Sequence, residues 1–232
     1  MPDNRERNMK KKLIQLPKTY LSYSQIQLWK SSRARYIELY MNNNQAFRLE
    51  NSGMAYGKVV ADALEKGLET GDLLTDAAML LLPKYDVADK EIRATIKTKE
   101  GSFDIIGRPD SLDSKTKAYI EYKTGKGAWT LAKAQKHPQM LFYALLIYLA
   151  YGVVLNEAKL IWIQTEDVVE QYGPEDWLQG EKKSIKPTGH IETFEVKFTL
   201  AEILNCLADT IRIAKEIELV WLSHIPQNTP QA

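Results

Sequence analysis

Residues 107–125, GRPDSLDSKTKAYIEYKTG, place two carboxylates and an ammonium in a segment that otherwise alternates like a pair of β-strands. In KAYIEYK successive side chains point to opposite faces, so Glu121 and Lys123 share one face. Asp110 ends the preceding segment. Pro109, directly before it, has no N–H to donate, which suits a strand end or a bulge. We therefore expect Asp110 to come within a few ångströms of Glu121.

The alternative is a chance pattern in which Glu121 forms a surface salt bridge with a lysine, an interaction that contributes ~0–1 kcal/mol. Three features argue against this alternative. The segment is bracketed by apolar strands, and Gly107 precedes Asp110 by three residues. A helix then follows in which Gln139 and Tyr143 are four residues apart and therefore share a face. That helix also carries three basic side chains, Lys133, Lys136 and His137.

Hydrophobic periodicity predicts three helices before these strands. They cover residues 21–41, about 53–67, and a short run that begins at Thr75 and is closed by Pro83. Ser22 and Gln25 have the spacing of a capping box for the first helix. The period then becomes that of β-strands, with turn-forming residues at 100–101 and 111–115. The three β-segments, which predict an antiparallel meander, are 91–99, 102–110 and 117–123.

Further along, a long helix is predicted over 129–151, followed by a buried strand over 158–165. The remaining predicted segments are an irregular acidic loop at 166–181, a strand at 192–198 and a helix at 199–221 that Thr199 and Glu202 open as a capping box. The order is α-βββ-α-β with additions at both ends, an α/β (α+β) class. We expect one domain over 19–225, between a flexible arm (1–18) and a tail (226–232).

The composition of the 232 residues is that of an ordinary globular protein, with 44% hydrophobic and 26% charged residues and a net charge of +1. The charges are unevenly spread, because 115–136 holds six lysines and one acid whereas 166–181 holds six acids and no Lys or Arg. This predicts a basic face and a separate acidic loop, although two solvated surfaces without a role remain an alternative. Cys206 is the only cysteine, so no disulfide framework or cysteine-based zinc site is expected.

The first residues lack an apolar run, and the longest apolar run, Met140 to Leu155, has 16 residues, fewer than a membrane span needs. We expect no signal peptide, no membrane contact and a cytoplasmic location, or the cytoplasm of an infected host. No Gly-rich phosphate loop and no Ser/His/Asp elbow is present, so nothing favours a metabolic enzyme.

GRPD, EYK and QMLFY, in this order, resemble the motifs of the PD-(D/E)XK nuclease superfamily. The most similar branch is the RecB-like one, which includes phage and CRISPR-associated DNA exonucleases. The resemblance covers roughly residues 20–165 and implies a restriction-endonuclease-like core, a central mixed sheet flanked by helices. It implies that Asp110, Glu121 and the backbone carbonyl of Tyr122 are metal ligands, and that Lys123 orients the attacking water or stabilises charge on the phosphate. It also implies four residues that contact the nucleic acid: Gln139, Tyr143, Lys126 and Lys136.

The sequence departs from this family at two places. The branch usually has His four residues after a helical Gly, but the position after Gly57 is Ala61. Glu65, one turn further along the same face, is the best replacement carboxylate and completes the expected catalytic and metal-binding set; Asp62 is second. Many relatives hold an iron–sulfur cluster with four cysteines, whereas this chain has Ser31 and Ser32 in the matching region and a single cysteine. No cluster is expected.

Charge arithmetic agrees with a metal site. Two carboxylates ~4 Å apart repel by ~4 kcal/mol at an effective dielectric near 20. Asp110, Glu121 and Glu65 together would carry three negative charges against one positive charge on Lys123, a deficit that protons or a divalent cation must relieve. Oxygen ligands favour one or two Mg²⁺ or Mn²⁺ ions over zinc.

The expected activity is metal-dependent hydrolysis of phosphodiester bonds in single- or double-stranded DNA. It would act from DNA ends, as an exonuclease in recombination, repair or phage DNA processing. A recombinase or helicase is the expected partner, and an oligomer is compatible with the sequence. The alternative is a catalytically weakened nuclease fold that binds DNA or serves as a scaffold, a reading that Ala61 motivates.

Overall fold

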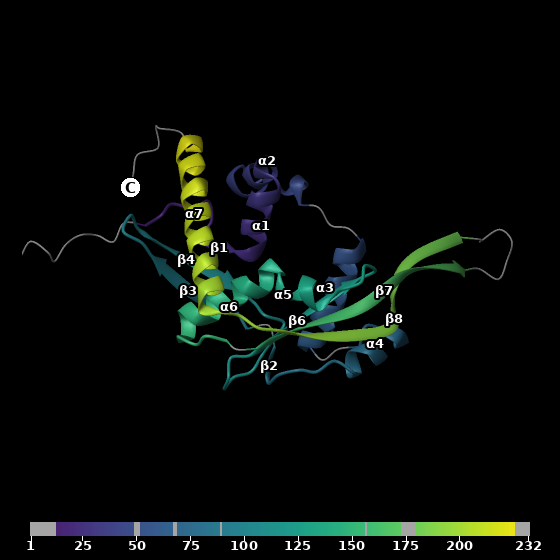
Figure 1. The fold of residues 1–232 in the computed structure, drawn as a ribbon. Coiled ribbons are helices and arrows are strands. Elements are labelled where there is room, and N and C mark those ends of the chain that lie inside the picture. Colours follow the sequence, from purple (N-terminus) through teal and green to yellow (C-terminus); the bar gives the residue numbers. More distant parts are fainter. Residues whose placement is uncertain are drawn as a thin grey trace, which may run out of the picture.

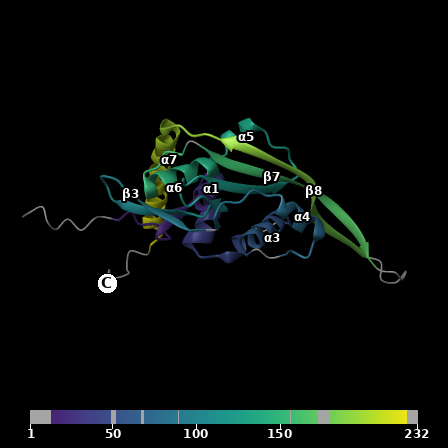
Figure 2. The same ribbon diagram turned by 90° about the horizontal axis from the view of Figure 1, so that it is seen from below.

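The computed structural model describes residues 13–48, 52–66, 69–88, 90–155, 157–172 and 180–225. Of residues 52–54, 64–66, 170–172 and 180–182 it describes only the backbone. The described chain forms two sheets with helices around them (Figures 1 and 2). The α/β class is confirmed. No helix within the described ranges combines the length and the apolar character needed to cross a membrane.

The first sheet has the order β1-β4-β3 and the second the order β2-β5-β6-β7-β8. The strands are β1 (Tyr20–Ser22), β2 (Val87–Ala88), β3 (Ile92–Lys97), β4 (Ser102–Gly107), β5 (Ser111–Leu112), β6 (Tyr119–Gly125), β7 (Ala158–Tyr172) and β8 (Gly180–Val196). Parallel pairing joins β1 to β4 and β6 to β7, while the other neighbours are antiparallel. Both sheets that can be assigned are therefore mixed.

The predicted meander is present only in part. β3 and β4 form an antiparallel hairpin, but β4 does not continue into pairing with β6. Instead the chain passes at residues 108–110 from the first sheet into the second, where Ser111 and Leu112 pair with Ile120 and Tyr119. The prediction of a turn at 111–115 is therefore wrong for its first two residues. A proline at position 109 cannot donate to a ladder, which explains why the strand breaks there.

The second sheet is covered on both faces. On one face Tyr119 and Leu160 belong to the larger core, together with α6 (Pro138–Tyr151) and α7 (Leu200–His224). On the other face Ile120 and Ile161 pack against α3 (Ser52–Lys66) and residues of and after α4 (Leu73–Leu80). This arrangement follows from the alternation of the strand, since adjacent residues of β6 enter different cores.

The predicted helix over 21–41 is divided by Ser32, whose backbone is extended. It becomes α1 (Tyr23–Ser31), α2 (Arg33–Tyr36) and the single π-turn η2 (Ile37–Met41), after which η3 (Gln45–Phe47) forms a short 3₁₀ turn. Ser22 caps α1 by accepting from the Gln25 amide, as the sequence predicts. The Ser32 hydroxyl caps α2 in the same manner, so the break satisfies a helix end.

The predicted helix over 129–151 is also divided, into α5 (Leu131–Gln135) and α6. Pro138 lacks an amide hydrogen and disfavours helical geometry at the residue before it, and His137 is indeed extended. Proline is well tolerated at the first helical position, where α6 places it. The division turns α6 so that Gln139, near its start, faces β6.

The region predicted to be an irregular acidic loop is largely a β-ribbon. β7 extends to Tyr172 and β8 begins at Gly180, so the prediction is wrong for 166–172 and 180–181, while 173–179 lie outside the described residues. The two strands project beyond the sheet (Figure 1). Their register puts Glu166 opposite Lys186, so the acids of β7 face a strand that carries bases.

Other predicted elements are confirmed. The capping box of Thr199 and Glu202 opens α7, and α3 covers the predicted second helix. α4 begins two residues before Thr75 because Asp72 caps it. Of the predicted arm, residues 13–18 are described, and Ile14 is buried beside β4. The predicted tail lies outside the described residues.

Candidate active site

Asp110 lies where the chain changes sheets. Ser111 and Ile120 are the last paired residues of β5 and β6, and one step beyond them the register places Asp110 opposite Glu121. The Oδ2 atom of Asp110 accepts a hydrogen bond of 2.7 Å from the backbone N–H of Tyr122. The carboxylate therefore takes the place of the missing strand partner of β6. This contact holds Asp110 at the open edge of β6, next to Glu121.

Glu121 is the buried acid of the cluster, with 3% of its surface exposed. Its Oε1 atom accepts hydrogen bonds of 2.6 Å from Lys123 Nζ and 2.6 Å from Gln139 Nε2. Lys123 Nζ also donates to Gln139 Oε1 at 2.7 Å, which closes a triangle of three side chains. The Oε2 atom of Glu121 is buried and has no hydrogen-bond partner among the described residues. One oxygen is thus fully used and the other is left without a compensating contact.

The pKa of Glu121 is raised from 4.5 to about 8. Burial is the main cause, because removal from water disfavours the charged form. The Lys123 ammonium lowers the pKa in part, and the Asp110 carboxylate raises it again. An isolated buried carboxylate of this kind takes up a proton at neutral pH unless further positive charge reaches it.

Gln139 and Tyr143 connect this cluster to the crossing between the sheets. Gln139 Nε2 donates to the Tyr143 hydroxyl at 3.1 Å, and that hydroxyl donates to the Arg108 carbonyl at 3.0 Å. The pKa of Tyr143 is raised by burial and, to a smaller extent, by the nearby Glu121 carboxylate. Tyr143 therefore keeps its proton and fixes the backbone two residues before Asp110.

Gly107 allows this contact by having no side chain. A Cβ atom at this position would lie 2.7 Å from Tyr143 Cε1 and 2.9 Å from Leu146 Cδ2. Both neighbours belong to α6 and are buried, so they have little room to move. The close approach of β4 to α6 at Gly107 is what brings the Arg108 carbonyl within reach of Tyr143.

Two residues near the cluster carry no expected role in the sequence. Tyr23 packs against His137 and Phe142 near the start of α6, and its pKa is raised by burial and, to a smaller extent, by the Glu121 carboxylate. His137 is half-buried between Tyr23 and Trp129, and its pKa is lowered to about 4 by burial and by Lys123 and Lys133. His137 is thus neutral at pH 7. Pro138 marks the position of His137 at the start of a helix, but no local sequence pattern points to Tyr23.

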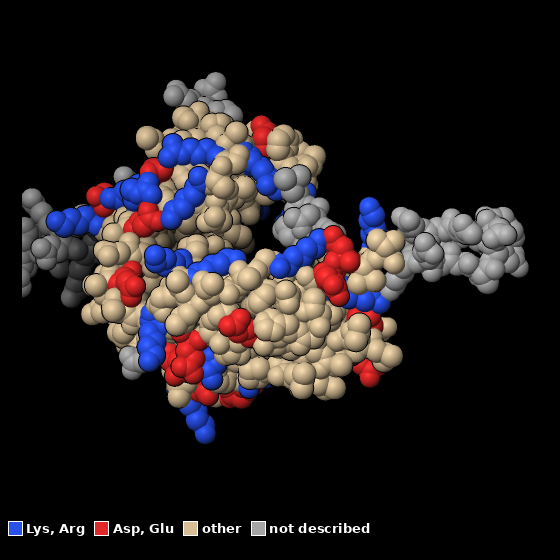
Figure 3. All heavy atoms as spheres, turned by 45° about the vertical axis from the view of Figure 1, so that its right-hand side comes forward, with Lys and Arg blue, Asp and Glu red and all other residues tan. Residues whose placement is uncertain are grey.

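Of the two lysines expected to bind nucleic acid, Lys126 forms an ion pair with Asp167 of β7, and Lys136 is exposed. Lys133 lies over the ring of Trp129 at 4.2 Å from its centroid. Figure 3 shows a hollow on one face of the molecule with Lys and Arg side chains along its margins. Basic side chains on α5 and after β6 are therefore present at the surface, although one of them is neutralised by a neighbour.

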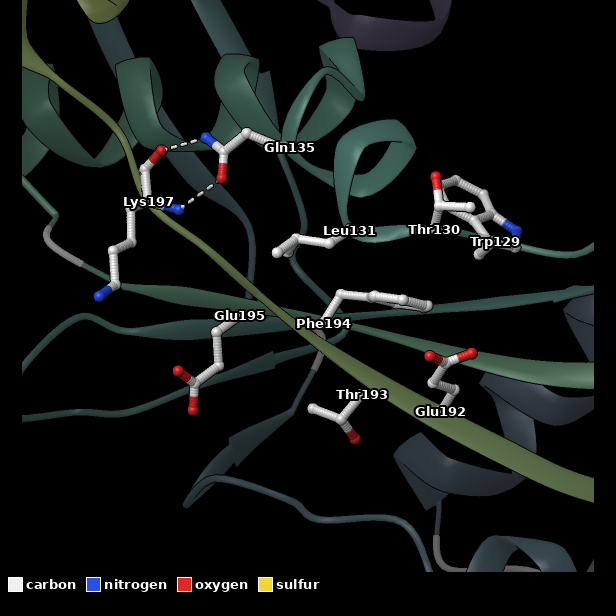
Figure 4. Close-up of a pocket in the computed structure, with 9 residues that line it drawn as sticks. All are labelled: Trp129, Thr130, Leu131, Gln135, Glu192, Thr193, Phe194, Glu195 and Lys197. Atoms are coloured by element: carbon white, nitrogen blue, oxygen red, sulfur yellow. Dashed lines mark hydrogen bonds between the residues drawn. The ribbon is translucent and has the colours of Figure 1, made fainter.

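A groove of about 780 Å³ lies elsewhere, between α5 and the outer strand β8 (Figure 4). Gln135 holds its rim by bonding both the N–H and the carbonyl of Lys197. Two exposed acids, Glu192 and Glu195, line it. Asp110, Glu121 and Lys123 do not, so the groove is distinct from the acidic cluster.

Comparison with known proteins bears on this cluster. The family model of the PD-(D/E)XK nuclease superfamily matches residues 61–218, more than half of the chain. The chain belongs to this superfamily. No curated protein matches it. Among solved structures, the crystal structure of SSO0001 is similar, with 15% identity, a TM-score of 0.42 and coverage of 84% of this chain and 77% of that one. A likeness at this level carries no further conclusion.

The resemblance inferred from the motifs is thus confirmed at the level of the superfamily. PD-(D/E)XK membership suggests a metal-dependent nuclease, so the acidic cluster should be able to hold a divalent ion. Within the described ranges no group of three His, Cys, Asp or Glu residues is arranged to hold a metal. Two acids are together, Asp110 and Glu121, and the Oε2 atom of Glu121, which has no hydrogen-bond partner in the described part of the chain, needs positive charge. An oxygen donor set of this kind fits Mg²⁺ or Mn²⁺.

The third expected ligand is on α3. Gly57 approaches β6 closely, since a Cβ there would lie 3.2 Å from Thr124 Oγ1. Ala61, one turn later, is exposed, and Asp62 is half-buried. The side chain of Glu65 lies outside the described residues, so its role stays a prediction. The carbonyl of Tyr122 as a ligand is likewise a prediction, whereas its amide is engaged by Asp110.

Cys206 lies on α7, and burial raises the pKa of its thiol to about 11. A protonated, half-buried thiol packs as a small apolar side chain. One cysteine cannot supply the four ligands that hold the iron–sulfur cluster of many PD-(D/E)XK relatives.

We predict that Gly107→Ala disturbs the site and the core together. The added methyl group overlaps Tyr143 and Leu146, and overpacking of this kind costs about 1–3 kcal/mol of unfolding free energy. Urea denaturation measures the loss. Gly127→Ala is the matched control, since no described atom lies within 4 Å of a Cβ there and the expected change is below ~0.5 kcal/mol. Equal stability of the two variants would show that α6 yields at Gly107.

We also predict that Glu121→Gln stabilises the metal-free protein at high pH. The folded-state pKa of Glu121 lies above its ordinary value, so the unfolded chain releases the proton first as pH rises. The wild type therefore loses stability from about pH 4.5 and levels off above about pH 8, whereas glutamine mimics the protonated form throughout. Thermal unfolding with a chelator should show a gain for Glu121→Gln that grows over this window. A gain that does not vary with pH would contradict the shift, and exposed Glu195→Gln is the control.

Proposed function

We propose that this chain is a divalent-metal-dependent deoxyribonuclease that hydrolyses phosphodiester bonds from DNA ends. The observation that carries the proposal is the buried Glu121 carboxylate, whose Oε2 atom has no hydrogen-bond partner among the residues that the structure describes, while Asp110 lies beside it. Such an arrangement costs stability and serves no packing purpose. Superfamily membership explains the arrangement, because the acidic residues of the PD-(D/E)XK motif belong to the active sites of nucleases.

Asp110 and Glu121 are the proposed ligands, with the Tyr122 carbonyl and Glu65 completing the set. A divalent ion bound there supplies positive charge that favours ionisation of a nearby water and offsets the charge of the phosphate. The protein prepares for this by fixing Asp110 through the Tyr122 amide and Glu121 through Lys123 and Gln139. These two carboxylates are thus held in place before any substrate arrives.

Lys123 is the proposed electrostatic catalyst. Two of the three N–H bonds of its ammonium are directed to Glu121 Oε1 and Gln139 Oε1, which leaves one to donate to the attacking water or to a phosphate oxygen. The water oxygen forms a bond to phosphorus as the bond to the leaving 3′-oxygen breaks, and negative charge grows on the phosphate. A fixed ammonium at this place stabilises that charge.

DNA is the proposed substrate, held by Lys136 and Lys126. The Gln139–Tyr143 pair of α6, whose hydrogen-bond donors are used within the site, would act on the DNA indirectly by positioning Lys123 and the Arg108 carbonyl. Action from DNA ends, in recombination, repair or phage DNA processing, follows from the motif resemblance to the RecB-like branch. A recombinase or helicase would be its partner in that setting. A second candidate is a nuclease fold that binds DNA without cutting it, which exposed Ala61 favours because the usual histidine ligand is missing.

Cleavage assays decide between these functions. We expect the wild type to degrade linear DNA with Mg²⁺ or Mn²⁺ and to leave covalently closed circular DNA intact. Asp110→Asn and Lys123→Ala should each reduce the rate by roughly 10²-fold or more, since each removes charge needed in the transition state. Glu195→Gln and Lys97→Ala, exposed changes away from the cluster, are controls.

A second readout is independent of cleavage. Mn²⁺ should raise the melting temperature of the wild type by mass action and should not raise that of Asp110→Asn. Salt-sensitive DNA binding with neither cleavage nor thermal stabilisation by Mn²⁺ would instead establish the non-cutting alternative. Degradation of circular DNA would refute only the preference for DNA ends and would leave the nuclease activity itself in place.

The replacement-ligand prediction needs its own variant. Glu65→Gln should weaken both cleavage and the thermal shift caused by Mn²⁺, because a ligand charge is lost. Asp62→Asn, on the same helix, should leave both close to the wild-type values. Unchanged cleavage in Glu65→Gln would remove Glu65 from the site while leaving the roles of Asp110 and Glu121 untouched.

A further inference from the structure

Helix α4 exposes an apolar surface that the proposed nuclease site does not use. Its side chains Leu73, Leu74, Leu80 and Leu81 are 86%, 57%, 86% and 74% exposed, and Ala77 is exposed among them. Successive helical residues are separated by about 100° around the axis, so these five side chains form one continuous arc of about 120°. The opposite arc, which includes Ala78, Met79 and the following Leu82, is buried.

This arc, Leu73, Leu74, Ala77, Leu80 and Leu81, is called the α4 stripe. A solvent-facing helix surface normally carries polar or charged side chains. Here every exposed position between Leu73 and Leu81 is apolar. Apolar patches that extend over several neighbouring side chains mark interaction sites.

We propose that the α4 stripe is the interface through which two copies of this chain form a dimer. A twofold interface brings the same surface of both copies together, so it must complement itself. An uncharged leucine stripe complements itself, because apolar side chains can pack against identical side chains and need no opposite charge on the partner. Antiparallel packing of two α4 helices across Ala77, the midpoint of the stripe, matches Leu73 of each copy with Leu81 of the other.

The charges at the two ends of α4 support this arrangement. Exposed Glu69 stands before the helix, whereas exposed Lys84 follows it and makes no ion pair within the described part of the chain. Asp72, which caps the helix, is already paired with Lys186. In an antiparallel pair Glu69 of one copy lies beside Lys84 of its partner. A parallel pair would instead bring like charges together, which is unfavourable.

The area is also sufficient for association. Burial of a leucine side chain removes on the order of 100 Å² of apolar surface from water. The α4 stripe therefore offers roughly 400–500 Å² on each copy, and a pair buries on the order of 1,000 Å², the lower limit of specific interfaces. A dimer of moderate affinity, dependent on protein concentration, is the expected result.

Sedimentation velocity on the full chain over a range of micromolar concentrations tests the proposal. The wild type should sediment as a species of twice the chain mass, and Leu80→Glu should weaken association at least tenfold. Leu219→Glu is the matched control, because Leu219 on α7 is equally solvent-facing at 74% exposure but lies outside the α4 stripe. Circular dichroism checks that each variant is folded, and Leu73→Glu serves should Leu80→Glu unfold.

Cross-linking fixes the symmetry. Ala77→Cys should form a disulfide-linked dimer under mild oxidation, whereas Ala201→Cys, an exposed alanine on α7, should remain monomeric on a non-reducing gel. A wild type that sediments as a monomer at every concentration overturns the proposal. So does a dimer that persists in both Leu80→Glu and Leu73→Glu, because it then uses another surface.

Discussion

The burial of one negative charge organises the region around β6. Glu121 is removed from water and its pKa is raised, and within the described ranges only one of its two carboxylate oxygens accepts a hydrogen bond. The neighbouring contacts with Lys123 and Gln139 reduce the cost of this burial without cancelling it, since the pKa remains well above the ordinary value. A buried carboxylate that lowers stability in this way is typical of a functional site. A fold that sought stability alone would place a neutral side chain there.

The crossing between the two sheets makes this burial compatible with an open site. If β4 had continued beside β6 as one meander, the edge of β6 beyond Ile120 would be sealed by backbone hydrogen bonds. Because the chain leaves the first sheet at residues 108–110, that edge stays open and the Asp110 side chain occupies it. Gly107, Tyr143 and the Arg108 carbonyl hold the crossing in place from the side of α6. The geometry of the acids is therefore set by a break in the sheet and not by the sheet itself.

The sequence predicted what depends on local spacing. Alternation along β6 placed Glu121 and Lys123 on one face, and the i, i+4 spacing of Gln139 and Tyr143 placed them together on α6. It also predicted both helix starts capped by Ser22 and Thr199. It failed where distant segments compete. The strand pairing of residues 166–172 depends on partners from residue 180 onward. At Pro138 the apolar residues on both sides favoured one continuous helix in the prediction, whereas the structure divides it there. Tyr23 reaches the site only through tertiary packing, so no spacing could reveal it.

The identity of Gln139 follows from its three simultaneous hydrogen bonds. Its amide nitrogen donates to Glu121 and to Tyr143, while its amide oxygen accepts from Lys123. A lysine could only donate and an ionised glutamate could only accept, so neither could bond all three neighbours. A shorter asparagine would have to reach the same atoms from the backbone of α6 with one methylene fewer. Glutamine thereby orients the Lys123 ammonium and the Glu121 carboxylate together without adding charge. The net charge of the cluster is then set by Asp110, Glu121 and Lys123.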